Sequence, residues 1–131
     1  MYAGDTVTLP TSVSFERRGE VAWLCIDRAD KANAMTADMM AQMKEHVVAA
    51  AGDTGIKALV LTGAGTRAFS GGVDVRTVSE LPADQARRLR SERFFELVIV
   101  LAGFSKPMIT RMNGVASGGG AMIALLADRV V

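Results

Sequence analysis

Two glycine-rich turns contain the residues of this chain that are best suited to chemistry. The first is Phe69-Ser-Gly-Gly-Val-Asp74 and the second is Asn113-Gly-Val-Ala-Ser-Gly-Gly-Gly120. Each follows a run of residues typical of a strand, and glycine lets main-chain N–H groups approach a ligand without a Cβ in the way. One N–H from each turn, directed at the same point, would form an oxyanion hole, which stabilises negative charge developing on a carbonyl oxygen. The two turns therefore predict one site.

The elements that would position these turns alternate between strand and helix. Strands are predicted over 21–26, 58–62 and 108–112, and another begins near 128. A helix follows Thr36, a longer one opens at 82–84 and runs toward Gly103, and a third covers 121–127. Because strands and helices alternate along the chain, we expect an α/β fold.

The residue patterns also predict which surfaces are buried. Thr36 is a suitable N-cap, and the face formed by Met39, Met43, Val47 and Ala50 is predicted to pack on the sheet. The strand over 58–62 is apolar throughout, as expected when both of its sides are covered. The segment 121–127 is apolar on every side, which predicts a buried helix.

Composition limits the class of protein. The chain has 131 residues, a net charge of +1 and 50% hydrophobic residues, which fits a single domain over 1–131 with its own core. No long block of one charge favours nucleic acid or an anionic membrane surface as a partner. Segment 1–5 lacks a basic targeting region and no apolar run could span a bilayer, so a cytoplasmic location is expected. A lone Cys25 excludes an internal disulfide and a zinc set, and we expect it to be a reduced core residue.

The last residues, 128–131, look like the start of a strand. A strand that stops there would leave ladder groups and apolar faces of its neighbours uncovered. The sequence is therefore expected to be the front portion of a larger fold or, if it is complete, to self-associate.

Three ordered motifs resemble those of the crotonase family, also called the enoyl-CoA hydratase/isomerase superfamily. Asp27-Arg-Ala-Asp-Lys-Ala-Asn-Ala-Met35 stands where family members commonly have Asn-Arg-Pro-x-Lys-x-Asn-Ala-Leu. The two glycine turns match the family's Phe-(Ser/Ala)-(Ala/Gly)-Gly-x-Asp and Asn-Gly-x-x-x-Gly-Gly-Gly segments. The resemblance extends from Val13 onward and is to the N-terminal part of the family.

The resemblance implies a repeated ββα spiral core that binds an acyl-CoA or enoyl-CoA thioester, with the chain stopping before the family's C-terminal portion. It places the two oxyanion-hole amides on Val73 and Gly119, where they would stabilise an enolate-like intermediate. Coenzyme A is part of the substrate, so no separate cofactor and no metal are expected, and family members form trimers or hexamers. The implied substrate-binding residues are Lys31, Ala32, Gly71, Gly72, Asp74, Val75, Arg76 and Gly118.

One departure from the family pattern bears on the reaction. Hydratases that resemble this chain carry a glutamate two residues after the glycine triplet, where this chain has Met122. A thioether cannot transfer protons, and the second glutamate of the hydratase pair belongs to a segment downstream of Val130. This favours an isomerase or another branch over a hydratase. The alternative is a catalytically inactive module that binds CoA thioesters or partner chains.

Other interpretations of these residues remain open. Lys31 and Arg76 are equally well explained as solvated surface charges, and Asp74 as the cap of a following helix, which we prefer. The arginines at 87, 88, 90 and 93 are expected to be solvated, and His46 to be a packed helix residue rather than a base. Segment 63–68 matches a short dinucleotide-binding motif, but 69–72 interrupts the helix that such a motif requires. Neither a Gly-x-Ser-x-Gly elbow nor a P-loop is present.

Overall fold

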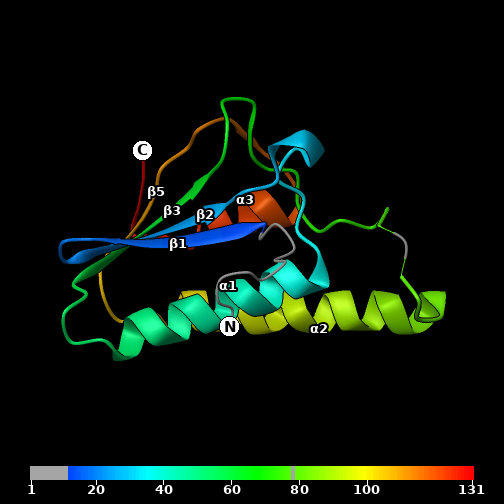
Figure 1. Cartoon of the computed structure of the whole chain (residues 1–131), viewed down its shortest axis with the longest axis horizontal. Helices are drawn as coiled ribbons and strands as arrows, with labels where there is room; N and C mark the ends of the chain where they lie inside the picture. Colours follow the sequence, from blue (N-terminus) through cyan, green and yellow to red (C-terminus); the bar gives the residue numbers. More distant parts are fainter. Residues whose placement is uncertain (1–11, 78) are drawn as a thin grey trace, which may run out of the picture.

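The computed structural model describes residues 12–77 and 79–131 (Figure 1). Segment 1–5, on which the expectation about targeting rests, lies outside the described residues, as does the start of the predicted single domain. The elements in chain order are β1 (Val13–Arg18), β2 (Val21–Ile26), the 3-10 helix η1 (Ala29–Lys31), α1 (Ala37–Gly52), β3 (Ala58–Gly63), β4 (Ala68–Ser70), α2 (Ala83–Ala102), β5 (Met108–Thr110), β6 (Val115–Ala116), α3 (Gly119–Ala124) and β7 (Arg129–Val130).

The main sheet has five strands in the order β1-β2-β3-β5-β7, and β4 pairs with β6 in a separate two-stranded sheet. β1 is antiparallel to β2, whereas every other pair is parallel. Parallel neighbours need crossover connections: α1 lies between β2 and β3, α2 between β3 and β5, and α3 between β5 and β7. α1 and α2 lie together on one face of the main sheet (Figure 1). The predicted α/β fold is confirmed.

The predicted start and buried face of α1 are confirmed. The Thr36 hydroxyl accepts a hydrogen bond of 3.1 Å from the N–H of Met39, which satisfies one of the free donors at the start of the helix. All four residues of the predicted face are buried, together with Met40. They pack against β2, whose alternate residues Ala22, Leu24 and Ile26 are buried in the same core.

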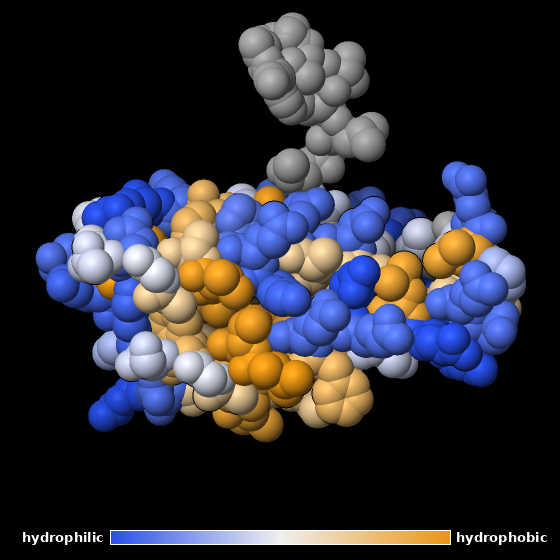
Figure 2. All heavy atoms as spheres, turned by 90° about the horizontal axis from the view of Figure 1, so that it is seen from below, coloured by the Kyte–Doolittle hydropathy of each residue, from blue (hydrophilic) through white to orange (hydrophobic). Residues whose placement is uncertain are grey.

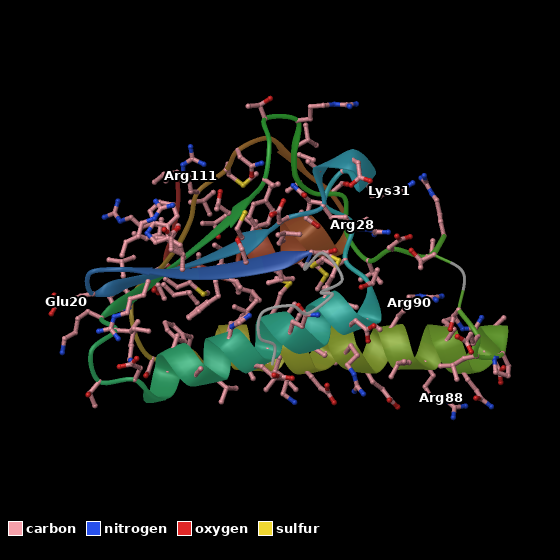
Figure 3. The ribbon with its side chains drawn as sticks, viewed as in Figure 1. Glu20, Arg28, Lys31, Arg88, Arg90 and Arg111 are labelled. Atoms are coloured by element: carbon pink, nitrogen blue, oxygen red, sulfur yellow. The ribbon has the colours of Figure 1, made fainter. Side chains whose placement is uncertain are left out.

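β3 lies in the middle of the sheet, and its residues from Leu59 to Gly63 are all buried, as its apolar sequence predicted. In α2, by contrast, only Ala86, Leu97 and Leu101 are buried. The arginines of α2 are exposed or half-buried, which confirms the solvated helix, and Figure 3 shows Arg88 and Arg90 extending from it. No helix within the described ranges 12–77 and 79–131 is long and apolar enough to cross a membrane.

Apolar side chains also lie on the surface. Figure 2 shows the molecule from the side of α1 and α2, with apolar residues gathered on part of that face. On α2, Phe95 and Ile99 are 68% and 65% exposed, and Leu125, directly after α3, is 73% exposed.

The structure departs from the predicted elements in three places. β1 was not predicted, because its sequence is mostly polar and only Val13 is buried. β4 and β6 form inside segments interpreted as turns, and strands of three and two residues are too short to show a periodic pattern. The third helix begins at Gly119, and Met122 is 54% exposed, so the prediction of a helix buried on every side is wrong. Only one side of α3, with Ile123 and Ala124, enters the core.

Candidate functional site

The two glycine turns are in direct backbone contact. Gly72 has φ of 101°, a conformation that side-chain-bearing residues rarely adopt, and a Cβ built on it would lie 3.2 Å from the nitrogen of Gly119. The parallel pair β4 and β6 joins the two turns, and the N–H of Ser117 donates to the carbonyl of Ser70 at 3.1 Å. Gly72 and Gly119 are 47 residues apart in the sequence, so two distant turns form one structural unit.

The N–H of Val73 has no hydrogen-bond acceptor in the part of the chain that the structure describes. Val73 forms an isolated parallel bridge with Met35. The N–H of Met35 donates a hydrogen bond to the carbonyl of Gly72, and the carbonyl of Met35 accepts one from the N–H of Asp74, both at 2.8 Å. In this bridge the carbonyl of Gly72 and the N–H of Asp74, on either side of Val73, both bond to Met35. The N–H of Val73 itself is therefore directed away from Met35.

The N–H of Gly119 is also without an acceptor among residues 12–77 and 79–131. Gly119 is the first residue of α3, and the first N–H groups of a helix have no partner within it. Two unpaired N–H groups thus lie on two turns that touch one another.

A cleft of about 870 Å³ runs beside the first turn. It is lined from η1, from the first glycine turn and from the middle of the second, with Val115 and Ser117. Seven of the residues predicted from the sequence line it: Lys31, Ala32, Gly71, Val73, Asp74, Val75 and Arg76. Gly72, Gly118 and Gly119 do not line it; Gly72 is buried behind the turn and the other two belong to the neighbouring turn.

Two arginines that sequence reasoning had not assigned also line the cleft, Arg28 and Arg67. Arg28 lies inside the first of the three motifs, so the motif itself was the available signal. Figure 3 shows Arg28 and Lys31 close to η1. Lys31, Arg67 and Arg76 are exposed, and within the described residues none of these three forms an ion pair. The cleft therefore presents unpaired positive charge.

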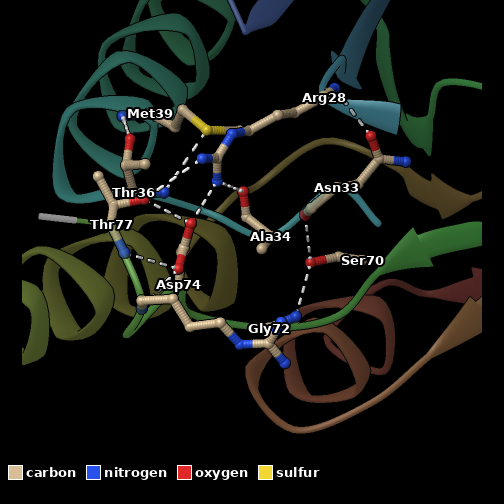
Figure 4. A network of polar contacts seen from close by, with 10 residues as sticks. Arg28, Asn33, Ala34, Thr36, Met39, Ser70, Gly72, Asp74 and Thr77 are labelled. Atoms are coloured by element: carbon tan, nitrogen blue, oxygen red, sulfur yellow. Dashed lines mark hydrogen bonds and ion pairs between the residues drawn. The ribbon is translucent and has the colours of Figure 1, made fainter. Parts of the chain in front are cut away.

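Asp74 is held by four donors and caps no helix. Its carboxylate accepts from Arg28 Nη1 and Thr77 Oγ1, each at 2.6 Å, and from the N–H groups of Arg76 (2.8 Å) and Thr77 (3.2 Å) (Figure 4). The preferred interpretation as a helix cap is wrong, because residues 75–77 are not helical and the carboxylate closes a turn instead. Burial by itself would raise the pKa of Asp74, but hydrogen bonds from Thr77, Arg28 and the N–H of Arg76 outweigh it and lower the pKa well below its usual range.

A second set of hydrogen bonds fixes the first turn from behind. Ser70 Oγ donates to the carbonyl of Asn33 at 2.9 Å and accepts from the N–H of Gly72 at 3.0 Å (Figure 4). The buried side chain of Asn33 donates to the carbonyl of Ala68 at 2.7 Å, and Asn113 from the second turn donates to the same oxygen at 2.8 Å. Sequence reasoning gave no role to these polar residues, although all three lie inside the motifs.

The competing interpretations have different outcomes. No helix begins at 63–68; β3 ends at Gly63 and β4 follows, which is not the geometry of a dinucleotide loop. His46 packs, as predicted: its ring stacks on Phe15 with centroids 4.6 Å apart, and burial lowers its pKa. Within the described residues no group of acidic, histidine or cysteine side chains could hold a metal ion.

The expectation for Cys25 is wrong in one respect. The side chain is half-buried and lies on the face of β2 opposite the buried Leu24 and Ile26, outside the main core. Burial, with the charge of Asp27, raises the pKa of its thiol.

Comparison with known proteins assigns this chain and its fold to a family. The family model described as enoyl-CoA hydratase/isomerase matches residues 21–131. A probable enoyl-CoA hydratase of Mycobacterium bovis is 35% identical over 134 residues, which cover 98% of this chain and 47% of that protein. A crotonyl-CoA hydratase of Syntrophomonas wolfei is 30% identical, over 89% of this chain and 45% of that protein.

Solved structures agree. That of an enoyl-CoA hydratase/isomerase from Mycobacterium paratuberculosis superposes with a TM-score of 0.81 at 30% identity, covering 95% of this chain and 50% of that one. The chain therefore belongs to the enoyl-CoA hydratase/isomerase family, the crotonase superfamily, and matches its N-terminal portion. It spans about half the length of the curated relatives that it matches.

Proposed function

We propose that this chain binds an acyl-CoA or enoyl-CoA thioester and holds the thioester oxygen between the N–H groups of Val73 and Gly119. The observation that carries the proposal is the pair of unpaired N–H groups on two touching turns. Donors fixed in advance at the oxygen stabilise the charge that develops there, which acidifies the α-protons and favours an enolate-like intermediate.

The cleft suits the remainder of such a ligand. Lys31, Arg67 and Arg76 supply exposed positive charge for the phosphates of coenzyme A. Ala32 and Gly71 line the same cleft and leave space beside the first turn. Coenzyme A enters as part of the substrate, so the proposal needs no separate cofactor.

The reaction we propose is an isomerisation or another enolate reaction of this family rather than hydration. Met122 stands on α3 where the resembling hydratases carry a glutamate, and its thioether has no proton to transfer. General acid–base catalysis needs a group of suitable pKa within hydrogen-bond reach of the substrate. Met122 cannot be that group.

The direct test is an ultraviolet difference titration with a conjugated dienoyl-CoA. Two N–H groups directed at the thioester oxygen should polarise the chromophore and shift its absorbance to longer wavelength, with saturation. Gly119→Pro removes the N–H and should abolish the shift, because proline has no amide hydrogen and is tolerated at the first position of a helix.

Gly119→Ala is the matched control. It adds a Cβ that would lie 2.8 Å from Cε1 of Phe94, at the far end of that side chain, but it keeps the N–H. We expect the alanine variant to retain the shift. A normal shift in the proline variant would remove Gly119 from the proposal, and no shift in the unsubstituted protein would refute the amide pair altogether.

The second candidate, a binding module without turnover, is favoured by Met122 alone. Exchange of the α-protons of a saturated acyl-CoA in D₂O separates the two functions. Deuterium incorporation that requires Gly119 N–H supports an enzyme, whereas a full red shift without any incorporation supports the module.

We also propose a homo-oligomer, a trimer or hexamer as in the family, located in the cytoplasm. The exposed Phe95, Ile99 and Leu125 are apolar surface that association would cover. Sedimentation equilibrium tests the assembly, and a monomer at high protein concentration would count against it.

A further inference from the structure

We infer that Arg28 and Asp74 form a positioning pair that fixes the direction of the Val73 N–H. The pair would therefore govern how strongly a bound thioester is polarised, rather than how tightly its CoA portion binds. This inference rests on the proposed function, since it names what holds one of the two proposed donors in place.

The guanidinium of Arg28 contacts both segments of the Met35–Val73 bridge. Its Nη1 donates to the carboxylate of Asp74, the residue after Val73, at 2.6 Å. The same nitrogen donates to the carbonyl of Ala34, the residue before Met35, at 3.0 Å. One planar group thus bonds a neighbour of each bridge residue, and the bridge is what directs the Val73 N–H away from Met35.

The surroundings of the pair make it stiff. The side chains of Arg28 and Asp74 are only 17% and 8% exposed. Thr77 closes the far side: its hydroxyl donates to Asp74 at 2.6 Å and accepts from Arg28 Nη2 at 3.3 Å. The main-chain N–H of Arg28 donates to Asn33 Oδ1 at 2.8 Å, which holds the base of the arginine as well. A fork with several donors in one plane is a property of arginine that lysine lacks.

Direct binding of a CoA phosphate is the other role that Arg28 could have, because it lines the cleft. Its Nη1 and Nη2 are already engaged with Asp74, Ala34 and Thr77, and its charge is balanced by an adjacent carboxylate. Lys31, Arg67 and Arg76 are exposed and form no ion pair within the described residues, so they are the better phosphate contacts. This separation of roles is what makes the inference testable.

The dienoyl-CoA titration yields both quantities in one experiment: Kd from its midpoint and polarisation from the shift at saturation. In Arg28→Lys and Asp74→Asn we expect the shift at saturation to fall to roughly half or less, because small displacements of a positioned group are costly to its function. Kd should change much less. Arg76→Gln should do the opposite, raising Kd with a full shift at saturation.

A remote ion pair provides the matched control. Arg17 and Asp53 pair at 3.1 Å on the surface, where their side chains are 48% and 40% exposed. Arg17→Lys should change neither Kd nor the shift. Circular dichroism confirms that each variant is folded, and if neither variant of the pair folds, Thr77→Val, which removes only the hydroxyl contacts, should still reduce the shift.

Each outcome has one meaning. A full shift at saturation in the folded variants, with or without a raised Kd, overturns the inference and leaves the two-amide proposal intact. Absence of a shift in the unsubstituted protein refutes the two-amide proposal, and the positioning role is refuted with it. A reduced shift with nearly unchanged Kd, seen in variants of the pair or of Thr77 and absent from Arg76→Gln and Arg17→Lys, supports the inference.

Discussion

Asn33 and Asn113 should be energetically coupled, because each compensates for loss of the other. Both side-chain amides donate to the carbonyl of Ala68, at 2.7 and 2.8 Å, and both donate to that of Ala64, at 3.0 and 3.3 Å. Each side-chain oxygen also accepts a hydrogen bond from a main-chain N–H that the other asparagine does not contact. Asn33 accepts from Arg28 at 2.8 Å, and Asn113 accepts from Gly63 at 3.0 Å.

The magnitudes follow from which partners each substitution leaves unsatisfied. Asn33→Ala leaves the N–H of Arg28 without its acceptor, but the two carbonyls keep Asn113, so we expect a loss of about 2–3 kcal/mol in unfolding free energy. Asn113→Ala should cost about 2 kcal/mol by the same reasoning, with Gly63 as the orphaned donor. In the double variant both carbonyls lose both donors, which should add about 1–2 kcal/mol beyond the sum of the single losses.

Urea unfolding with linear extrapolation measures all four proteins of the cycle. Gln42→Ala, which removes a half-buried amide that makes no hydrogen bond within the described residues, is the control and should stay within about 0.5 kcal/mol of the unsubstituted protein. The reasoning would be refuted by losses that add within about 0.5 kcal/mol, since residues sharing no acceptor behave that way. If the double variant does not fold, Asn113→Ser in the Asn33→Ala background provides a milder second arm.

Three further outcomes are expected. Lys106→Met should lower the unfolding free energy by about 1–3 kcal/mol in a urea titration, because Lys106 Nζ donates at 2.7 Å to the carbonyls of both Ala50 and Asp53 at the end of α1, and Lys106→Arg should recover part of the loss. Burial lowers the pKa of His46, so the unfolded chain takes up the proton at a higher pH than the folded one, and stability should fall as the pH decreases below 6.5. His46→Phe should make the melting temperature depend less on pH over that range. An unchanged dependence of the melting temperature on pH would contradict this. Because the pKa of the Cys25 thiol is raised, it should react more slowly with a thiol reagent at pH 8 than a free cysteine does. Unfolding the protein in urea should restore the reaction rate of a free cysteine. Equal rates in the folded and unfolded protein would contradict this.

The elements that sequence reasoning predicted well are those with a strong local signal. α1 has a capping residue followed by an apolar face of helical period, and β3 is an uninterrupted apolar run. β1 has neither feature: five of its six residues are not buried, and it is a strand because β2 pairs with it along its whole length. The predicted third helix ran past Ala124, where α3 ends, and was expected to be buried on every side. Apolar composition does not reveal which side of a short helix packs against the core.

The sequence by itself determined the α/β class, the two glycine turns and the three motifs that place the chain in its family, because each is a property of neighbouring residues. Tertiary structure alone decided which groups meet. The nitrogen of Gly119 approaches Gly72 because β4 and β6 pair, and Arg28 reaches Asp74 across 46 residues because β2 and the bridge at Met35 bring those segments together. Contacts of this kind depend on strand pairing and register between distant segments, for which no local run of residues carries a signal. For the same reason Asp74 looked like a helix cap in the sequence, whereas in the fold its carboxylate is the partner of the half-buried guanidinium of Arg28.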